Sequence, residues 1–274
     1  MSTSPWPDAS DTALAAAQLG RLTTMDRPGR VVAVRGVHGG AGATTVAAHL
    51  AGAWARWGPS PVGLLDLAGG LAHRLDLAPG VRTWTDLAGL VDEPDDQALA
   101  GALTQPSPDL WVLPLTGLVD GGRAEPAPDP ALVRAVLAAG RRVWRVVVVD
   151  LPPAAGPQVD AALGLAEVLL AVGRCHSAGV RGTRAALDLW AAAGRDLDAA
   201  GAVITGVRSR APLAPREARA LLGERLWALV ADEAAEFGAA AEDGMLLLDR
   251  QDLQAVQVLV TLANRVVAFS TSAG

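Results

Sequence analysis

The regular alternation of strand-like and helix-like segments constrains this chain more than any other feature. Short runs of apolar and β-branched residues recur along the sequence, and segments of helical periodicity separate them. The runs lie at residues 30–35, 62–66, 109–114, 144–150, 166–172, 202–207 and 226–230. Such alternation with short links predicts an α/β fold of three layers, in which helices cover both faces of a doubly wound, mostly parallel sheet.

The length of the chain suits one large α/β domain. It has 274 residues, 51% of them hydrophobic, and shows no internal repeat and no convincing linker. Prolines at positions 5 and 7 and a weak helical pattern predict a loose tail over residues 1–28. We expect a single domain over 29–270 and a short tail over 271–274.

The charge and composition of the chain argue against DNA and a membrane as binding partners. The net charge of −6 does not attract DNA or an anionic membrane. No apolar run is long enough to span a membrane, and the predicted C-terminal helix over 253–269 carries one basic residue, Arg265, where a membrane-binding helix would be strongly basic. The single cysteine, Cys175, fits a reducing cytoplasm. The histidines and Cys175 lack the spacing of metal ligands.

A glycine-rich segment joins the first predicted strand to a predicted helix over 44–57; it reads Val-His-Gly-Gly-Ala-Gly-Ala-Thr-Thr over residues 37–45. Glycines there let the backbone approach a phosphate, and the positive end of the helix attracts it. The hydroxyl of Thr44 is placed where such a loop meets Mg²⁺. We therefore predict a nucleotide-binding loop made by Gly39, Gly40, Gly42, Ala43, Thr44 and Thr45.

Two other interpretations of the loop are open at this point. The segment could be a tight turn that binds nothing. It could also belong to a dinucleotide-binding fold, since Asp66 ends the next strand where a ribose-binding acid could lie, although the third small residue of that fingerprint is replaced by Thr45. Asp150 favours the phosphate-binding loop, because it ends an apolar strand and precedes a Leu-Pro-Pro turn. We expect Thr44, Asp66 and Asp150 to be linked to Mg²⁺.

With these motifs the sequence resembles the MinD/ParA superfamily of deviant Walker-A ATPases, in particular its CpaE/TadZ-like and septum-site-determining-like branches. The resemblance runs from residue 30 to about residue 269. The family loop Gly-Lys-Gly-Gly-Val-Gly-Lys-Thr-Thr corresponds to residues 37–45, its Asp-x-Asp to residues 66–68, and its Asp-x-Pro-Pro to residues 150–153. The resemblance implies a P-loop NTPase fold of the MinD-like (SIMIBI) class, binding of ATP with Mg²⁺, and a homodimer.

The sequence departs from the family pattern at residues that carry the family's chemistry. His38 replaces the lysine that reaches across the family's dimer, Ala43 replaces the loop lysine that contacts the β- and γ-phosphates, and Ala68 replaces the acid that orients the attacking water. Thr205 lies near the family's adenine-reading asparagine. All 23 basic residues are arginines, so no other lysine can substitute. Four arginines could supply charge instead: Arg35, Arg74, Arg174 and Arg181.

These departures predict a pseudo-ATPase that keeps the fold and the dimerisation surface, with weak or absent binding of ATP and Mg²⁺ and no catalytic residue. His38 and Arg181 are candidate contacts to the nucleotide or to the second subunit. The resemblance implies a cytoplasmic protein that protein partners recruit to a pole or septum, where it places a pilus or secretion apparatus or the division site. An active nucleotide-switch ATPase is the alternative, and a DNA-partitioning ATPase is less favoured by the charge.

Overall fold

The computed structural model describes residues 28–77, 81–92, 96, 99, 103–115, 126–208 and 211–272. In this part of the chain eight strands form one sheet in the order β3-β4-β2-β5-β1-β6-β7-β8. All neighbouring strands are parallel except β3 and β4. The strands are β1 (Arg30–Gly36), β2 (Val62–Asp66), β3 (Thr104–Ser107), β4 (Leu110–Leu113), β5 (Val146–Leu151), β6 (Val168–Arg174), β7 (Ala200–Val207) and β8 (Leu226–Ala231).

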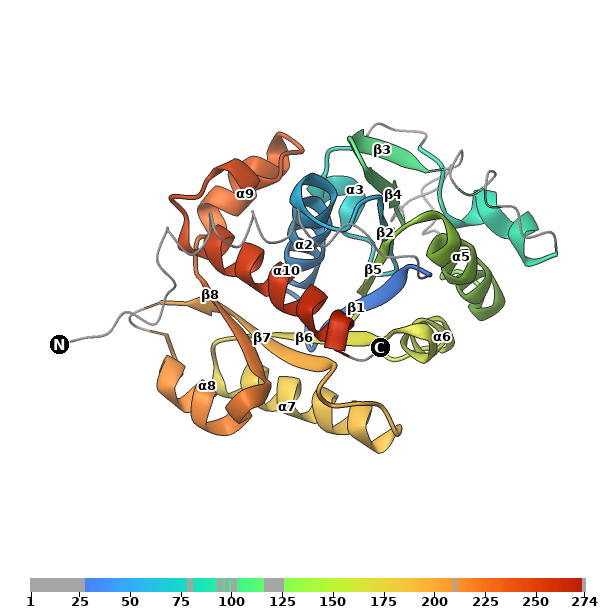
Figure 1. Ribbon diagram of the computed structural model, residues 1–274. Coiled ribbons are helices and arrows are strands. Elements are labelled where there is room, and N and C mark those ends of the chain that lie inside the picture. Colours follow the sequence, from blue (N-terminus) through green and yellow to red (C-terminus); the bar gives the residue numbers. More distant parts are fainter. Residues whose placement is uncertain are drawn as a thin grey trace.

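Helices cover both faces of the sheet, which confirms the predicted three-layer fold (Figure 1). One face is covered by α2 (Ala43–Trp57) and α10 (Gln254–Ser272), and the other by α5 (Pro130–Val143), α6 (Pro157–Leu165), α7 (Ser177–Ala192) and α8 (Pro215–Leu222). The remaining helices are α3 (Leu71–Arg74), α9 (Ala234–Glu242) and the 3₁₀ helices η1 (Trp84–Val91), η2 (Gly223–Arg225) and η3 (Leu247–Asp249).

The central strands are apolar on both sides because both sides are buried. In β5, Val148 packs into the cluster beneath α2 and α10, whereas Val149 packs into the cluster beneath α5 and α6. All six residues of β5 are buried. The continuous apolar run therefore reflects a strand with a hydrophobic core on each face.

Glycine at position 63 lets a helix end approach the sheet closely. The ring of Trp144, at the end of α5, covers Gly63 of β2, and a Cβ atom built on Gly63 would lie 2.4 Å from the ring. The same ring lies against Gly140 of α5. These contacts fix α5 on β2 and β5.

The predicted strands are confirmed within a few residues, but five described elements were not predicted: α3, α6, β3, η2 and η3. The helix α6 has weak periodicity, α3, η2 and η3 are only three or four residues long, and β3 is a short antiparallel edge strand without an apolar pattern. Residues 1–27 of the expected N-terminal tail and residues 273–274 of the expected C-terminal tail lie outside the described residues. Among the described residues, no helix combines the length and apolarity needed to cross a membrane.

Candidate functional site

The glycine-rich loop lies at the carboxyl edge of the sheet, where ligands of open α/β folds bind. The strand β1, which precedes it, lies between β5 and β6. The pairing of Val34 with Asp150 brings the end of β5 beside the start of the loop. The strand order thus brings the predicted loop and the predicted acid together.

The loop has the backbone conformation for which glycine is required. Gly40 and Gly42 have φ angles of +73° and +88°, in the left-handed region that side chains disfavour. Gly42 is the N-cap of α2, and no side chain caps this helix. The first N–H groups of α2 therefore have no intrahelical acceptor and no side-chain cap, which is the arrangement that suits an anion.

A threonine from a distant strand holds the loop in place. The hydroxyl of Thr205, in β7, donates a hydrogen bond of 2.7 Å to the carbonyl oxygen of Ala41. The methyl group of Thr205 lies 3.5 Å from the position of a Cβ atom on Gly42. The hydroxyl of Thr205 therefore supports the backbone of the loop.

Thr44 and Asp150 are joined directly. The Thr44 hydroxyl donates a hydrogen bond of 2.6 Å to Oδ2 of Asp150, whereas Oδ1 of Asp150 is buried without a partner among the described residues. Burial, and secondarily the charge of Asp66, raises the pKa of Asp150 to about 8. A hydroxyl oxygen beside a carboxylate with an unused oxygen is a donor set that fits Mg²⁺.

Asp66 serves the backbone of the following loop. Its Oδ1 accepts hydrogen bonds from the N–H groups of Ala68 and Gly69, at 2.8 and 2.7 Å, and its Oδ2 accepts one from Leu71 at 2.9 Å. Burial raises its pKa, and these N–H donors oppose the shift. Strand pairing places Asp66 beside Asp150. The contacts of the Asp66 carboxylate shape the start of α3. Its link to Mg²⁺ stays a prediction.

His38 and Arg181 form contacts with residues that do not belong to the start of α2. The His38 ring stacks on His176, with centroids 5.2 Å apart, and its Nε2 accepts a long bond of 3.4 Å from the N–H of Arg174. Arg181 is exposed on α7 and donates a hydrogen bond to Ser177 of the same helix. Their predicted roles toward nucleotide or a second subunit remain predictions.

Three of the four arginines that could replace the missing lysines form hydrogen bonds or ion pairs with side chains or carbonyl groups outside the glycine-rich loop. Arg35 donates to the carbonyl of Pro153, Arg174 pairs with Asp232 at 3.5 Å, and Arg181 binds Ser177. Arg74, at the end of α3, is 6% exposed, and one of its nitrogens donates to the carbonyl of Phe237 at 3.2 Å. Its Nε and Nη2 are buried without a partner among the described residues. The sequence named Arg74 as a candidate but gave no reason to prefer it.

A cavity of about 300 Å³ adjoins the start of α2 and is named here the Arg74 cavity. The residues that line it come from α2, α3, β6, β7, β8, α9 and α10 and include Gly42, Thr45, Arg74, Arg174, Thr205, Phe237 and Leu259. It therefore connects two predicted loop residues, Gly42 and Thr45, with the buried guanidinium.

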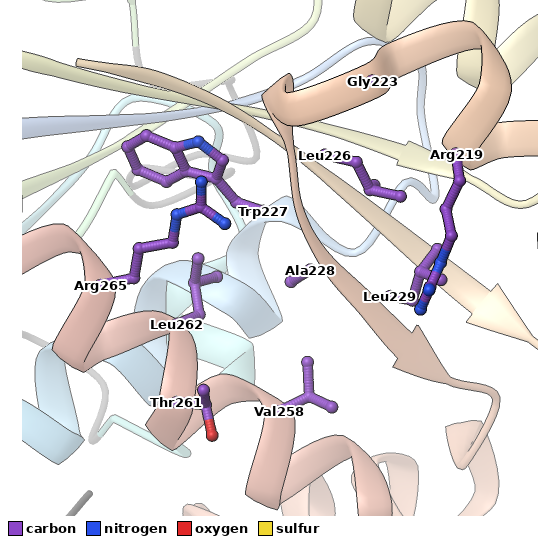
Figure 2. Close-up of a pocket in the computed structure, with 10 residues that line it drawn as sticks. All are labelled: Arg219, Gly223, Leu226, Trp227, Ala228, Leu229, Val258, Thr261, Leu262 and Arg265. Atoms are coloured by element: carbon purple, nitrogen blue, oxygen red, sulfur yellow. The ribbon is translucent and has the colours of Figure 1, made fainter. Parts of the chain in front are cut away.

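A larger hollow, of about 520 Å³, lies between β8 and α10 (Figure 2). In it the guanidinium of Arg265 lies over the ring of Trp227, 4.8 Å from its centroid. None of the residues that line this hollow belongs to the glycine-rich loop.

Structural comparison finds proteins of the same architecture. A ParA family ATPase from Chlorobium tepidum TLS matches 85% of this chain and 98% of its own, with a TM-score of 0.75 and 16% identity. The septum site-determining protein MinD from Pyrococcus horikoshii OT3, complexed with Mg-ADP, matches 89% of this chain and 98% of its own (TM-score 0.71, 19% identity). MinD of the MinC:MinD complex from Aquifex aeolicus matches 87% and 96% (TM-score 0.70, 17% identity). No family model and no curated protein matches the sequence.

Proposed function

We propose that this chain, which has the fold of the MinD and ParA ATPases, is a positioning or scaffolding protein of their superfamily whose nucleotide site hydrolyses ATP slowly or not at all. The finer assignment is to the CpaE/TadZ-like or septum-site-determining-like branch. The protein would help to localise a pilus or secretion apparatus, or the division site, through contacts with other proteins. The observation that carries the proposal is a glycine-rich loop with left-handed glycines at the uncapped start of α2, in a chain that has no lysine.

The parts of the site that hold a nucleotide and a metal are present. Gly40 and Gly42 give the loop its left-handed turns, and the uncapped start of α2 offers N–H groups to phosphate. Thr44 and Asp150 would hold Mg²⁺, which supplies charge neutralisation between phosphate oxygens when it is bound. The P. horikoshii relative is complexed with Mg-ADP, so the same class of ligand is the natural candidate here.

The parts that accelerate hydrolysis are missing. Ala43, at the loop lysine position, is 9% exposed and has no charge to offer a γ-phosphate. Ala68 is exposed and has no carboxylate to orient water. A hydrogen bond to a charged group is worth about 1.5–3 kcal/mol, so the loss of two lysines weakens nucleotide binding by roughly two to four orders of magnitude. The same loss removes charge stabilisation in the transition state.

Partner proteins are the proposed targets of the scaffold. In the A. aeolicus structure MinD is in a complex with MinC, which supports a protein partner as the class of target. A homodimer is part of the proposal, because the family fold uses one. The net charge of −6 does not favour DNA, and a DNA shift that weakens steeply with salt would favour the partitioning alternative.

Calorimetry with ATP tests whether the loop is used as a phosphate-binding loop. We expect weak binding that Mg²⁺ strengthens in the wild-type chain, and no strengthening by Mg²⁺ in Asp150→Ala. Equal Mg²⁺-dependent binding by both proteins would show that the loop and Asp150 do not act together. Tight binding with rapid turnover by the wild-type chain would instead favour the active nucleotide switch.

A further inference from the structure

Arg74 is a buried cation whose partners do not balance its charge. Its side chain is 6% exposed, and it donates a hydrogen bond to a neutral carbonyl, that of Phe237. Two of its nitrogens, Nε and Nη2, have no hydrogen-bond partner in the described part of the chain. Burial lowers the pKa of the guanidinium, but arginine still keeps its proton at neutral pH. An unbalanced buried charge is costly unless a ligand compensates it.

The acidic residues of the same cavity have other partners. Asp232 lies between Arg174 and Arg208, at 3.5 and 3.6 Å. The carboxylate of Glu233 accepts the N–H groups of Gln254 and Ala255, at 3.1 and 3.0 Å, at the start of α10. Asp232 and Glu233 therefore have partners of their own, and neither is paired with Arg74.

The rest of the cavity suits a ligand with a large apolar part. Val46, Phe237 and Leu259 line it together with Arg74, and the start of α2 opens into it at Gly42 and Thr45. The uncapped helix start is a second source of positive potential. At about 300 Å³ the cavity is at the small end of the range of ligand sites. A phosphate group with a planar, mostly apolar substituent matches this combination.

We propose that the Arg74 cavity binds a nucleoside phosphate, and that Arg74 supplies to its phosphate part of the positive charge that position 43 no longer carries. This inference rests on the proposed use of the glycine-rich loop as a nucleotide site. It adds a residue from α3, outside the loop. In this proposal the positive charge comes from Arg74 in α3 and not from a lysine of the loop. The chain can therefore keep the shape of the loop without its lysines.

Binding of ADP, AMP and adenosine to Arg74→Met tests the proposal, because methionine keeps most of the length of the side chain and removes the charge. We expect the variant to bind ADP and AMP about 10- to 100-fold more weakly than the wild-type chain, the loss expected for a charged hydrogen bond. Adenosine, which lacks phosphate, is expected to bind both proteins alike. Arg56→Met is the matched control, since Arg56 is an exposed arginine of α2 that pairs with Asp249, and it should bind ADP as the wild-type chain does.

The unfolding temperature without ligand separates a binding role from a structural one. If the charge of Arg74 serves ligand binding and not folding, ligand-free Arg74→Met unfolds at the wild-type temperature or above it. The increase in unfolding temperature that ADP produces in the wild-type chain is then lost in the variant. Four results would overturn the proposal: no ADP binding by the wild-type chain, equal ADP binding by the variant, a lower unfolding temperature of the ligand-free variant, or inorganic phosphate binding as tightly as ADP. None of these measurements involves hydrolysis, so a result that overturns the role of Arg74 leaves the pseudo-ATPase proposal standing. Rapid turnover of ATP would contradict the pseudo-ATPase proposal but would not bear on the role of Arg74.

Discussion

The hydroxyl of Thr44 lies 2.6 Å from Oδ2 of Asp150 and ties the first turn of α2 to the end of β5. The other carboxyl oxygen of Asp150 is buried without a partner among the described residues. The two residues are 106 positions apart, so only the strand order of the sheet brings them together. This pair defines the metal side of the proposed nucleotide site.

The stability of the ligand-free protein should depend on pH through Asp150. Its pKa is raised to about 8 in the folded chain, whereas the unfolded chain loses this proton at about pH 4. The folded state therefore binds more protons between these values, and its stability falls as the pH rises from about 4 to 8.

Asp150→Asn removes this pH effect because asparagine does not titrate. We expect the gain in the free energy of unfolding from this substitution to be about 3 kcal/mol larger at pH 7.5 than at pH 5. Urea denaturation of both proteins, without Mg²⁺ or nucleotide, measures the difference. The same difference at the two pH values would mean that the carboxyl is ionised in the folded chain.

Returning a lysine to the loop should restore affinity. Ala43→Lys places an ammonium group at the family's phosphate-contacting position, and we expect it to bind Mg-ATP at least about 10-fold more tightly than the wild-type chain. Ala192→Lys, at the exposed end of α7, adds the same charge away from the site and serves as the control. Equal gains in both variants would point to a general effect of charge.

The bond from Thr205 to the loop should contribute measurably to stability. Thr205→Val keeps the shape of the side chain but leaves the buried carbonyl of Ala41 without this donor. We expect a loss of about 1–3 kcal/mol in the free energy of unfolding. Thr205→Ser keeps the hydroxyl and should lose less than half as much; a larger loss for serine than for valine would assign the effect to packing.

Gly63 should tolerate no side chain. A Cβ atom there would lie 2.4 Å from the ring of Trp144, and overpacking of this kind costs about 1–3 kcal/mol. Thermal unfolding of Gly63→Ala measures the loss. Gly238→Ala in α9 is the control, because a Cβ atom there would meet nothing within 4 Å, and we expect it to be neutral or stabilising by up to about 1 kcal/mol.

The sequence predicted the sheet and the loop because both depend on local patterns. Each buried strand is a continuous apolar run, and the loop and Asp150 each follow such a run, so parallel pairing alone brings them to one edge. The helix α6 was missed because its apolar residues follow no clear period. The strand β3 was missed because its exposed residues pair with β4 without burying a face.

The charge distribution in the site could not be predicted in the same way. Nothing local distinguishes Arg74 from Arg35, Arg174 or Arg181, and its burial results from the packing of α3 against α9, two elements far apart in sequence. The link of Asp66 to Mg²⁺ stays a prediction, and the motif did not indicate that its carboxylate accepts N–H groups two to five residues later in the chain. Which group each side chain meets is decided by tertiary packing, which the motif does not contain.

Whether this chain hydrolyses ATP is decided by single-turnover phosphate release, with protein in excess over Mg-ATP so that weak binding does not hide slow chemistry. We expect the same slow release from the wild-type chain and from Asp150→Ala, because the wild-type loop has no lysine and position 68 is an alanine without a carboxylate. Release from the wild-type chain at least about tenfold faster than from Asp150→Ala would overturn the pseudo-ATPase proposal and show an active ATPase.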